Sequence, residues 1–213
     1  MKRLLFFLTL LFTLALTMTG LAKEKPAPAP FNPALPSVAV IYVNNAQTTY
    51  DNRIDKFALE NLHLAIPSST YNYLEGSKYR ENLSAAGIDD ISTAERSDII
   101  DALYGEDVDY LVYLEFMPIT GREKRSVFSK GKIMNVVAPF KIIDVKNNRN
   151  LYNGRLNEQG KTTVMFGNIG NKSVGLEGVK LVNAKVAEII AARLPKVKAD
   201  QAAPLAKSSN GQP

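Results

Sequence analysis

The chain has 213 residues, with 26 lysines and arginines against 21 aspartates and glutamates, a single histidine and no cysteine. A chain of this length can bury a sizeable core unaided, and the absence of cysteine excludes a disulfide scaffold, a zinc–thiolate site and a cysteine nucleophile. The single histidine, His63, also excludes a metal site built on several imidazoles.

The first 22 residues predict export. Two basic residues at 2–3 precede an apolar run over 4–16, and the small residues Gly20 and Ala22 follow it. This is the pattern of a secretory signal peptide over 1–22, cleaved after Ala22. The apolar run is shorter than the roughly 20 residues that a membrane span requires, so a retained anchor is the weaker alternative. We therefore expect an exported protein, periplasmic or extracellular, with no transmembrane helix after cleavage.

Composition divides the rest of the chain into three parts. Residues 23–36 hold five prolines among alanines, which favours extended polyproline structure and predicts a linker. Residues 37–195 alternate apolar and polar stretches and predict a single domain. Residues 196–213 are rich in alanine, serine, lysine and proline and predict a disordered tail.

Two strands are predicted at the centre of the domain, over 38–43 and 110–116. Alternate residues of a strand face opposite ways, and in 110–116 both sets are apolar apart from Glu115. Such a strand belongs in a sheet covered by helices on both faces. Gly105, before the second strand, suits the left-handed residue that ends a helix. The predicted fold class is α/β (α+β), a mixed sheet with helices packed on it.

Between these strands the sequence predicts three helices and a short strand. Asp51 can cap the first helix, and a tyrosine-rich strand follows at 69–74. A polar helix is predicted over 78–86. Residues 92–95 (Ser-Thr-Ala-Glu) form a capping box, in which the serine hydroxyl and the glutamate carboxylate each serve the other residue's backbone amide. The third helix then leads through a right-handed crossover to the second central strand.

After the second central strand the pattern changes to strands alone. Antiparallel hairpins are predicted over 126–166, with a turn at 146–149 and a bulge or break at Gly131 and Pro139. A C-terminal helix is predicted over 176–194, because valines and isoleucines recur there at helical spacing.

No motif predicts a catalytic residue, a metal ligand or a cofactor. Two glycine-rich stretches, 154–162 and 167–173, have the wrong spacing for a phosphate loop. His63 has no serine or aspartate at any spacing known for a catalytic triad. The alternative to a binding protein is a secreted hydrolase that acts on cell-envelope polysaccharide through carboxylates such as Asp98 or Asp101.

The predicted function is non-enzymatic protein interaction or envelope assembly, with envelope proteins as partners. Exposed loops on a rigid scaffold often carry recognition, so we expect partner contacts in the charged hairpin and in the glycine loop before the last helix. These candidate residues are Arg122, Lys124, Arg125, Lys130, Lys132, Asn168, Asn171 and Lys172. Peripheral contact with anionic lipid and a homo-oligomer formed through a sheet edge remain alternatives, and nucleic acid is not an expected partner of an exported protein.

Several segments, in this order, resemble a known family. They are the strand 38–43, the helix from Ala94 to Leu103, the stretch Val108 to Val112, the strand from Phe140 to Val145 and the final helix. Together they are similar to the exported α/β domain shared by the curli secretion channel protein, the N-terminal domain of TolB and the outer-membrane activators of penicillin-binding proteins. The resemblance implies a periplasmic adaptor or assembly domain that works by protein contact. Several relatives are lipoproteins, an anchor that a chain without cysteine lacks.

Overall fold

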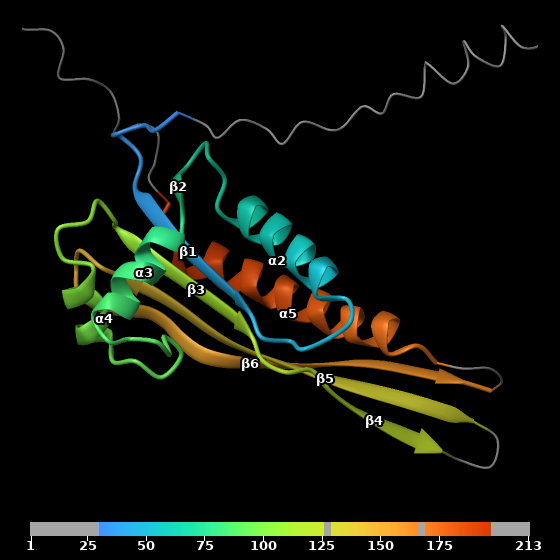
Figure 1. Ribbon diagram of the computed structural model, residues 1–213. Helices are drawn as coiled ribbons and strands as arrows, with labels where there is room; N and C mark the ends of the chain where they lie inside the picture. Colours follow the sequence, from blue (N-terminus) through green and yellow to red (C-terminus); the bar gives the residue numbers. More distant parts are fainter. Residues whose placement is uncertain (1–29, 126–128, 166–168, 197–213) are drawn as a thin grey trace, which may run out of the picture. The chain divides into compact units, whose positions relative to one another are not determined.

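The computed structural model describes residues 30–125, 129–165 and 169–196 (Figure 1). The predicted signal peptide lies outside these residues, as do half of the predicted linker, residues 23–29, and almost all of the predicted tail. In the described part of the chain, six strands form one mixed sheet. They are β1 (Ser37–Asn44), β2 (Asn72–Glu75), β3 (Tyr110–Phe116), β4 (Thr120–Arg125), β5 (Lys130–Asp144) and β6 (Arg149–Val164).

The sheet contains both parallel and antiparallel strand pairs. The order is β2-β1-β3-β5-β4, with β6 paired to β5. Strand β1 is parallel to β2 and β3, whereas β5 is antiparallel to all its neighbours. The second half of β5 pairs with β3 and its first half with β4, while β6 runs along the whole of β5. The α/β class and the mixed sheet are therefore confirmed.

Helices cover both faces of the β1–β3 region, as the two-sided strands predict. The helices are α2 (Asp51–Ala65), α3 (Ser77–Ala85), α4 (Arg96–Ala102) and α5 (Asn171–Arg193). Val112 and Leu114 of β3 are buried in the core that includes α2 and α5, whereas Leu111 and Tyr113 are buried in the core under α3 and α4. Glycines with positive φ follow two of the helices, at Gly87 (82°) and Gly105 (86°). This conformation is the one expected of Gly105.

The predicted capping box is wrong. The hydroxyl of Ser92 donates to Oδ1 of Asp90 at 2.6 Å, and the backbone N–H of Ser92 donates to the same oxygen at 2.9 Å. Asp90 lies two residues before Ser92, so its carboxylate accepts both hydrogen bonds and the serine hydroxyl does not cap a helix. Helix α4 begins later, at Arg96, and its N-cap Glu95 makes no side-chain capping bond.

The start of the first helix and the short strand also differ from expectation. Asp51 is the first residue of α2 rather than its cap, and its carboxylate accepts from the backbone N–H and the hydroxyl of Thr48. Strand β2 lies over Asn72–Glu75, so it begins three residues later than predicted and ends one residue later. Helix α5 starts at Asn171, five residues before the predicted helix, and otherwise matches it.

Strand β5 is unbroken, against the predicted bulge at Gly131 and Pro139. The irregularity lies between Ile142 and Ile143 instead. Pro139 is tolerated because it lies where no strand pairs with this edge of β5. On that edge, the pairing with β3 ends at Phe140 and the pairing with β4 covers only residues 130–135. The carbonyl of Val137 accepts from the backbone N–H of Met117 on that edge. Residues two apart in a strand direct their backbone groups to the same side, so the nitrogen of Pro139, which has no hydrogen, faces the stretch between the β3 and β4 pairings.

Candidate functional site

Past the end of β3 the sheet continues as three strands with a helix on one face. Figure 1 shows β4, β5 and β6 running beyond α3 and α4. Helix α5 lies on one side of this extension, where its backbone approaches Gly160 of β6. The core under α3 and α4 takes only Ile143 from β5, and within the described residues it takes nothing from β4 or β6. One face of the extension therefore has no helix over it.

Register assigns residues to this uncovered face, because directly paired residues point the same way. Arg122 of β4 pairs with Ile133 of β5, which pairs with Lys161 of β6. The neighbouring rows give the rest of what we call the open face: Thr120, Arg122, Lys124, Gly131, Ile133, Asn135, Val137, Arg155, Asn157, Gln159, Lys161 and Thr163.

The open face carries positive charge without negative charge. Its ionisable residues are Arg122, Lys124, Arg155 and Lys161, and all four are exposed. The acidic residues of the same strands, Glu123 and Glu158, fall on the opposite face by register, where they pair with Lys132 and Lys185. No ion pair within the described residues involves the four basic residues of the open face, so their charges remain available to an anionic partner.

Beneath the charged side chains the open face is apolar and holds an unsatisfied acceptor. Ile133 is buried and Val137 half-buried, although no helix covers them. By register Ile133 lies between Arg122 and Lys161, whose long side chains can cover it. In the next row, Oδ1 of Asn135 is shielded from solvent and has no hydrogen-bond partner within the described residues. A donor from a bound partner would satisfy it.

The structure divides the predicted contact residues between two faces. Arg122 and Lys124 lie on the open face, whereas Lys130 and Lys132 fall on the face that α5 covers, and Lys132 is only 14% exposed beside Glu123. By register Arg125 is opposite Lys130. The remaining candidates lie near the start of α5. They are Asn171 and Lys172, which are exposed, and Asn168, which lies outside the described residues.

Sequence reasoning missed Arg155 and Lys161, which complete the basic face. The available signal was a row of polar residues at every second position from Asn153 to Thr163, none of them acidic, although Glu158 and Thr162 between them are polar as well. Residues at every second position of a strand share one face, and an unbroken polar row indicates an exposed face. The strand pairing that places Arg122 and Lys161 on either side of Ile133 cannot be read from that row.

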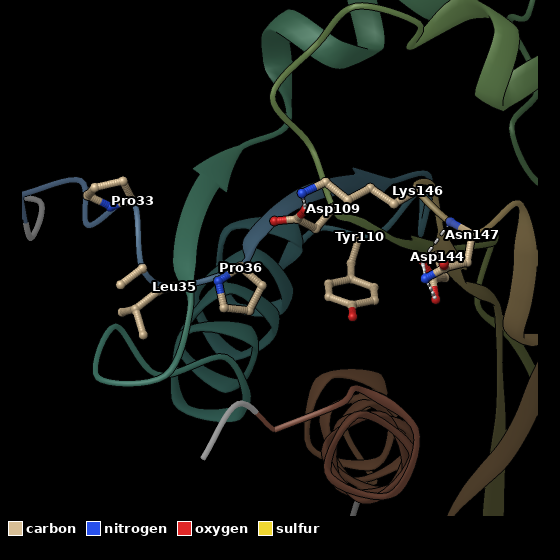
Figure 2. Close-up of a pocket in the computed structure, with 9 residues that line it drawn as sticks. Pro33, Leu35, Pro36, Asp109, Tyr110, Asp144, Lys146 and Asn147 are labelled. Atoms are coloured by element: carbon tan, nitrogen blue, oxygen red, sulfur yellow. Dashed lines mark hydrogen bonds and ion pairs between the residues drawn. The ribbon is translucent and has the colours of Figure 1, made fainter. Parts of the chain in front are cut away.

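A second cluster surrounds a cavity of about 250 Å³ at the opposite end of the sheet. In Figure 2, Tyr110 lies between Pro36 and the pair formed by Asp144 and Asn147. The carboxylate of Asp109 accepts the backbone N–H of Ser37 at 2.6 Å and is ion-paired with Lys146. Asn72 also holds the segment before β1, through bonds with the backbone of residues 32 and 35. This cluster fastens the start of the domain to the sheet.

Asp144 is the most enclosed charge of that cluster. Burial alone would raise its pKa, but bonds donated by Asn147 and by Nε of Arg149 at 2.8 Å outweigh it and hold the pKa below its ordinary value. Burial, with help from Asp144 and Asp109, raises the pKa of the Tyr110 hydroxyl. A carboxylate that remains ionised and accepts hydrogen bonds from Asn147 and Arg149 is poorly suited to act as a general acid.

The Asp144→Asn variant is expected to lower the free energy of unfolding by about 1 to 2 kcal/mol at neutral pH, because a neutral amide makes weaker bonds to Arg149. The folded-state pKa lies below the ordinary 3.8, so the carboxylate stabilises the fold above that pH and the stabilisation is lost as pH falls through the folded-state pKa. The difference between variant and wild type should therefore shrink below about pH 4. Urea denaturation across this range measures it, and a difference that does not change with pH would contradict the assignment.

The carboxylates proposed for a hydrolase do not line this cavity. Asp98 and Asp101 are exposed on α4. Asp109 and Asp144 line one cavity, but each is paired with a cation. Within the described residues no group of three or more histidine, cysteine, aspartate or glutamate side chains could hold a metal ion. None of the described helices combines the length and the apolar character that a membrane span needs.

Comparison with known proteins finds likeness at the level of solved structures. No family model and no curated protein matches the chain. A putative neuraminyllactose-binding hemagglutinin homolog from Helicobacter pylori is 8% identical over 75% of this chain and 90% of its own, with a TM-score of 0.47. TolB from Acinetobacter baumannii is 13% identical over 78% of this chain and 30% of its own, with a TM-score of 0.33.

The penicillin-binding-protein activators are found as well. The C-terminal domain of LpoB from Salmonella enterica is 13% identical over 62% of this chain and 83% of its own, with a TM-score of 0.29. The structures similar to this chain thus include two of the three groups named from sequence, and the likeness to the curli channel stays a prediction. At these identities and TM-scores, no activity, partner or residue role passes from them to this chain.

Proposed function

We propose that this chain is a non-enzymatic, exported domain that binds a protein of the cell envelope through the open face. The observation that supports it is the set of four exposed basic side chains on a sheet face without a helix, none of which forms an ion pair within the described residues. Three antiparallel strands backed by α5 hold these side chains at fixed spacings, so the surface needs little ordering when a partner binds. The predicted signal peptide over 1–22 supports location outside the cytoplasm.

The character of the face fits protein recognition. Arginine is enriched at protein interfaces, and half-buried Val137 with buried Ile133 supply an apolar centre inside a charged rim. The unsatisfied Oδ1 of Asn135 adds a site for one specific hydrogen bond. These features would give a partner both orientation and affinity.

The test is the size of the complex that the protein forms in its own envelope. Wild-type protein released with mild detergent should elute as a complex larger than the chain, whose mass before processing is 23.4 kDa. The Arg155→Glu/Lys161→Glu variant should shift to the free chain, because charge reversal on the open face repels an acidic partner.

A matched control changes the same charge on the other side of the sheet. Arg53 of α2 and Arg193 of α5 are exposed, and Arg53→Glu/Arg193→Glu should leave the complex intact. Thermal unfolding of both variants confirms that each is folded. A complex unaffected by reversal on the open face, or disrupted equally by the control, would refute the proposed surface.

A further inference from the structure

We propose that the occupant of the open face is a second copy of this chain, bound face to face about a two-fold axis. The inference rests on the proposed function, since it names the partner of the same surface. It follows from opposite charges at two places on one side of the sheet, where helix α3 also lies and carries the exposed Lys78 and Arg80. The open face supplies the positive half, and α4 with the segment before it supplies a negative half.

The negative half lies over β1, β3 and the end of β5. Segment 88–104 contains five acidic residues and one basic residue, Arg96. The acidic residues are Asp89, Asp90, Glu95, Asp98 and Asp101, and all are exposed. Ile99 and Leu103 hold α4 against the sheet, so Asp101 is on the outward side of the helix and Asp98 is beside it. No ion pair within the described residues involves either aspartate.

An exposed aromatic side chain adjoins these carboxylates. Tyr104 lies two residues after the end of α4 and is 91% exposed, the largest value among the large hydrophobic side chains of the described residues. Tyrosine is enriched among the residues that dominate binding energy, and its ring can pack against arginine. Arg122 and Arg155 of the open face provide such groups.

The acidic helix α4 projects from the sheet, and the basic open face is recessed beside it. A helix with its side chains is about 10 Å across, so the open face lies about 10 Å behind the outer surface of α4. Figure 1 shows α4 and the extension of β4, β5 and β6 at different places along the sheet. A two-fold rotation about an axis between them would seat each copy's α4 over the other copy's open face. The acidic helix then meets the basic strands twice in one isologous interface.

The same relief disfavours a flat anionic membrane as the occupant. A lipid surface approaching this side would meet Asp98 and Asp101 before it reached the recessed basic residues. Charges separated by about 10 Å or more are largely screened at physiological salt, so the recessed cations would gain little from the lipid. A second copy can enter the recess.

Sedimentation velocity of the purified protein tests the inference. The wild type should sediment as a dimer at about 0.05 M salt and dissociate towards the monomer near 0.5 M. Arg155→Glu/Lys161→Glu and Asp98→Lys/Asp101→Lys should each raise the dimer dissociation constant at least about 100-fold, because like charges then face each other at two places. Tyr104→Ala should raise it about tenfold or more.

Mixing the two charge-reversed variants gives the decisive result. Each alone repels itself, but together they present opposite charges at both contacts, so an equimolar mixture should form a heterodimer with wild-type affinity. The Arg53→Glu/Arg193→Glu control should dimerise like the wild type. A wild-type monomer at all concentrations and low salt, or a mixture that stays monomeric, would overturn the inference. If the envelope complex still depends on Arg155 and Lys161, the proposed function then stands with another protein as partner.

Discussion

Gly160→Ala is expected to lower the free energy of unfolding by about 3 kcal/mol, because α5 packs directly on the backbone of β6 at this residue. A methyl group here would collide with the carbonyl oxygen of Val174 and lie 2.9 Å from the backbone nitrogen of Gly178. Both atoms belong to the helix backbone, which cannot move without lifting α5 from the sheet. Equilibrium urea denaturation measures the loss.

Gly131→Ala is the matched control for that variant. It lies in β5 of the same extension, and a methyl group there has ordinary contacts, with Oγ1 of Thr163 nearest at 3.5 Å. Because alanine restricts the unfolded chain more than glycine does, the change should be neutral or stabilising by up to about 1 kcal/mol. Equal destabilisation by the two substitutions would show that α5 does not approach β6 as closely as described.

Phe140→Ala is expected to cost about 3 to 5 kcal/mol, because the side chain is fully buried between the sheet and the α2–α5 layer. The Phe140 ring lies 5.4 Å from the ring of Tyr152, centroid to centroid, and both belong to strands of the central sheet. Truncation removes this contact and leaves a cavity. The same denaturation measurement applies.

Leu64→Ala provides the comparison for Phe140→Ala. Leu64 lies in the last turn of α2 and is 81% exposed, so its truncation should change stability by no more than about 0.5 kcal/mol. Similar losses for the two variants would contradict the placement of Phe140 in the core.

The elements that the sequence predicted well are those whose own residues decide them. The strand from Tyr110 to Phe116 is apolar on both faces, and that alone requires layers on both sides. Helix α5 repeats its apolar residues over six turns, so its identity was clear although its start was not. The capping box failed because its outcome depended on competition from Asp90, which the motif does not include.

The candidate site was predicted only in part, because it depends on register. Arg122, Lys124, Lys130 and Lys132 are neighbours in sequence, yet alternation along β4 and β5 places them on opposite faces. Arg155 and Lys161 are distant in sequence and reach the same face through pairing of β5 with β6. Neither separation nor convergence follows from local composition, since both arise from strand pairing across the whole extension.

Site-specific photo-crosslinking along β6 in living cells tests the open face most directly. A photoreactive residue is placed in turn at Asn157 and Thr163, on the open face, and at Glu158 and Thr162, on the face towards α5. The proposed surface predicts covalent adducts from Asn157 and Thr163 and none from Glu158 and Thr162, a pattern with the period of a strand. Adducts from all four positions, or only from Glu158 and Thr162, would contradict it.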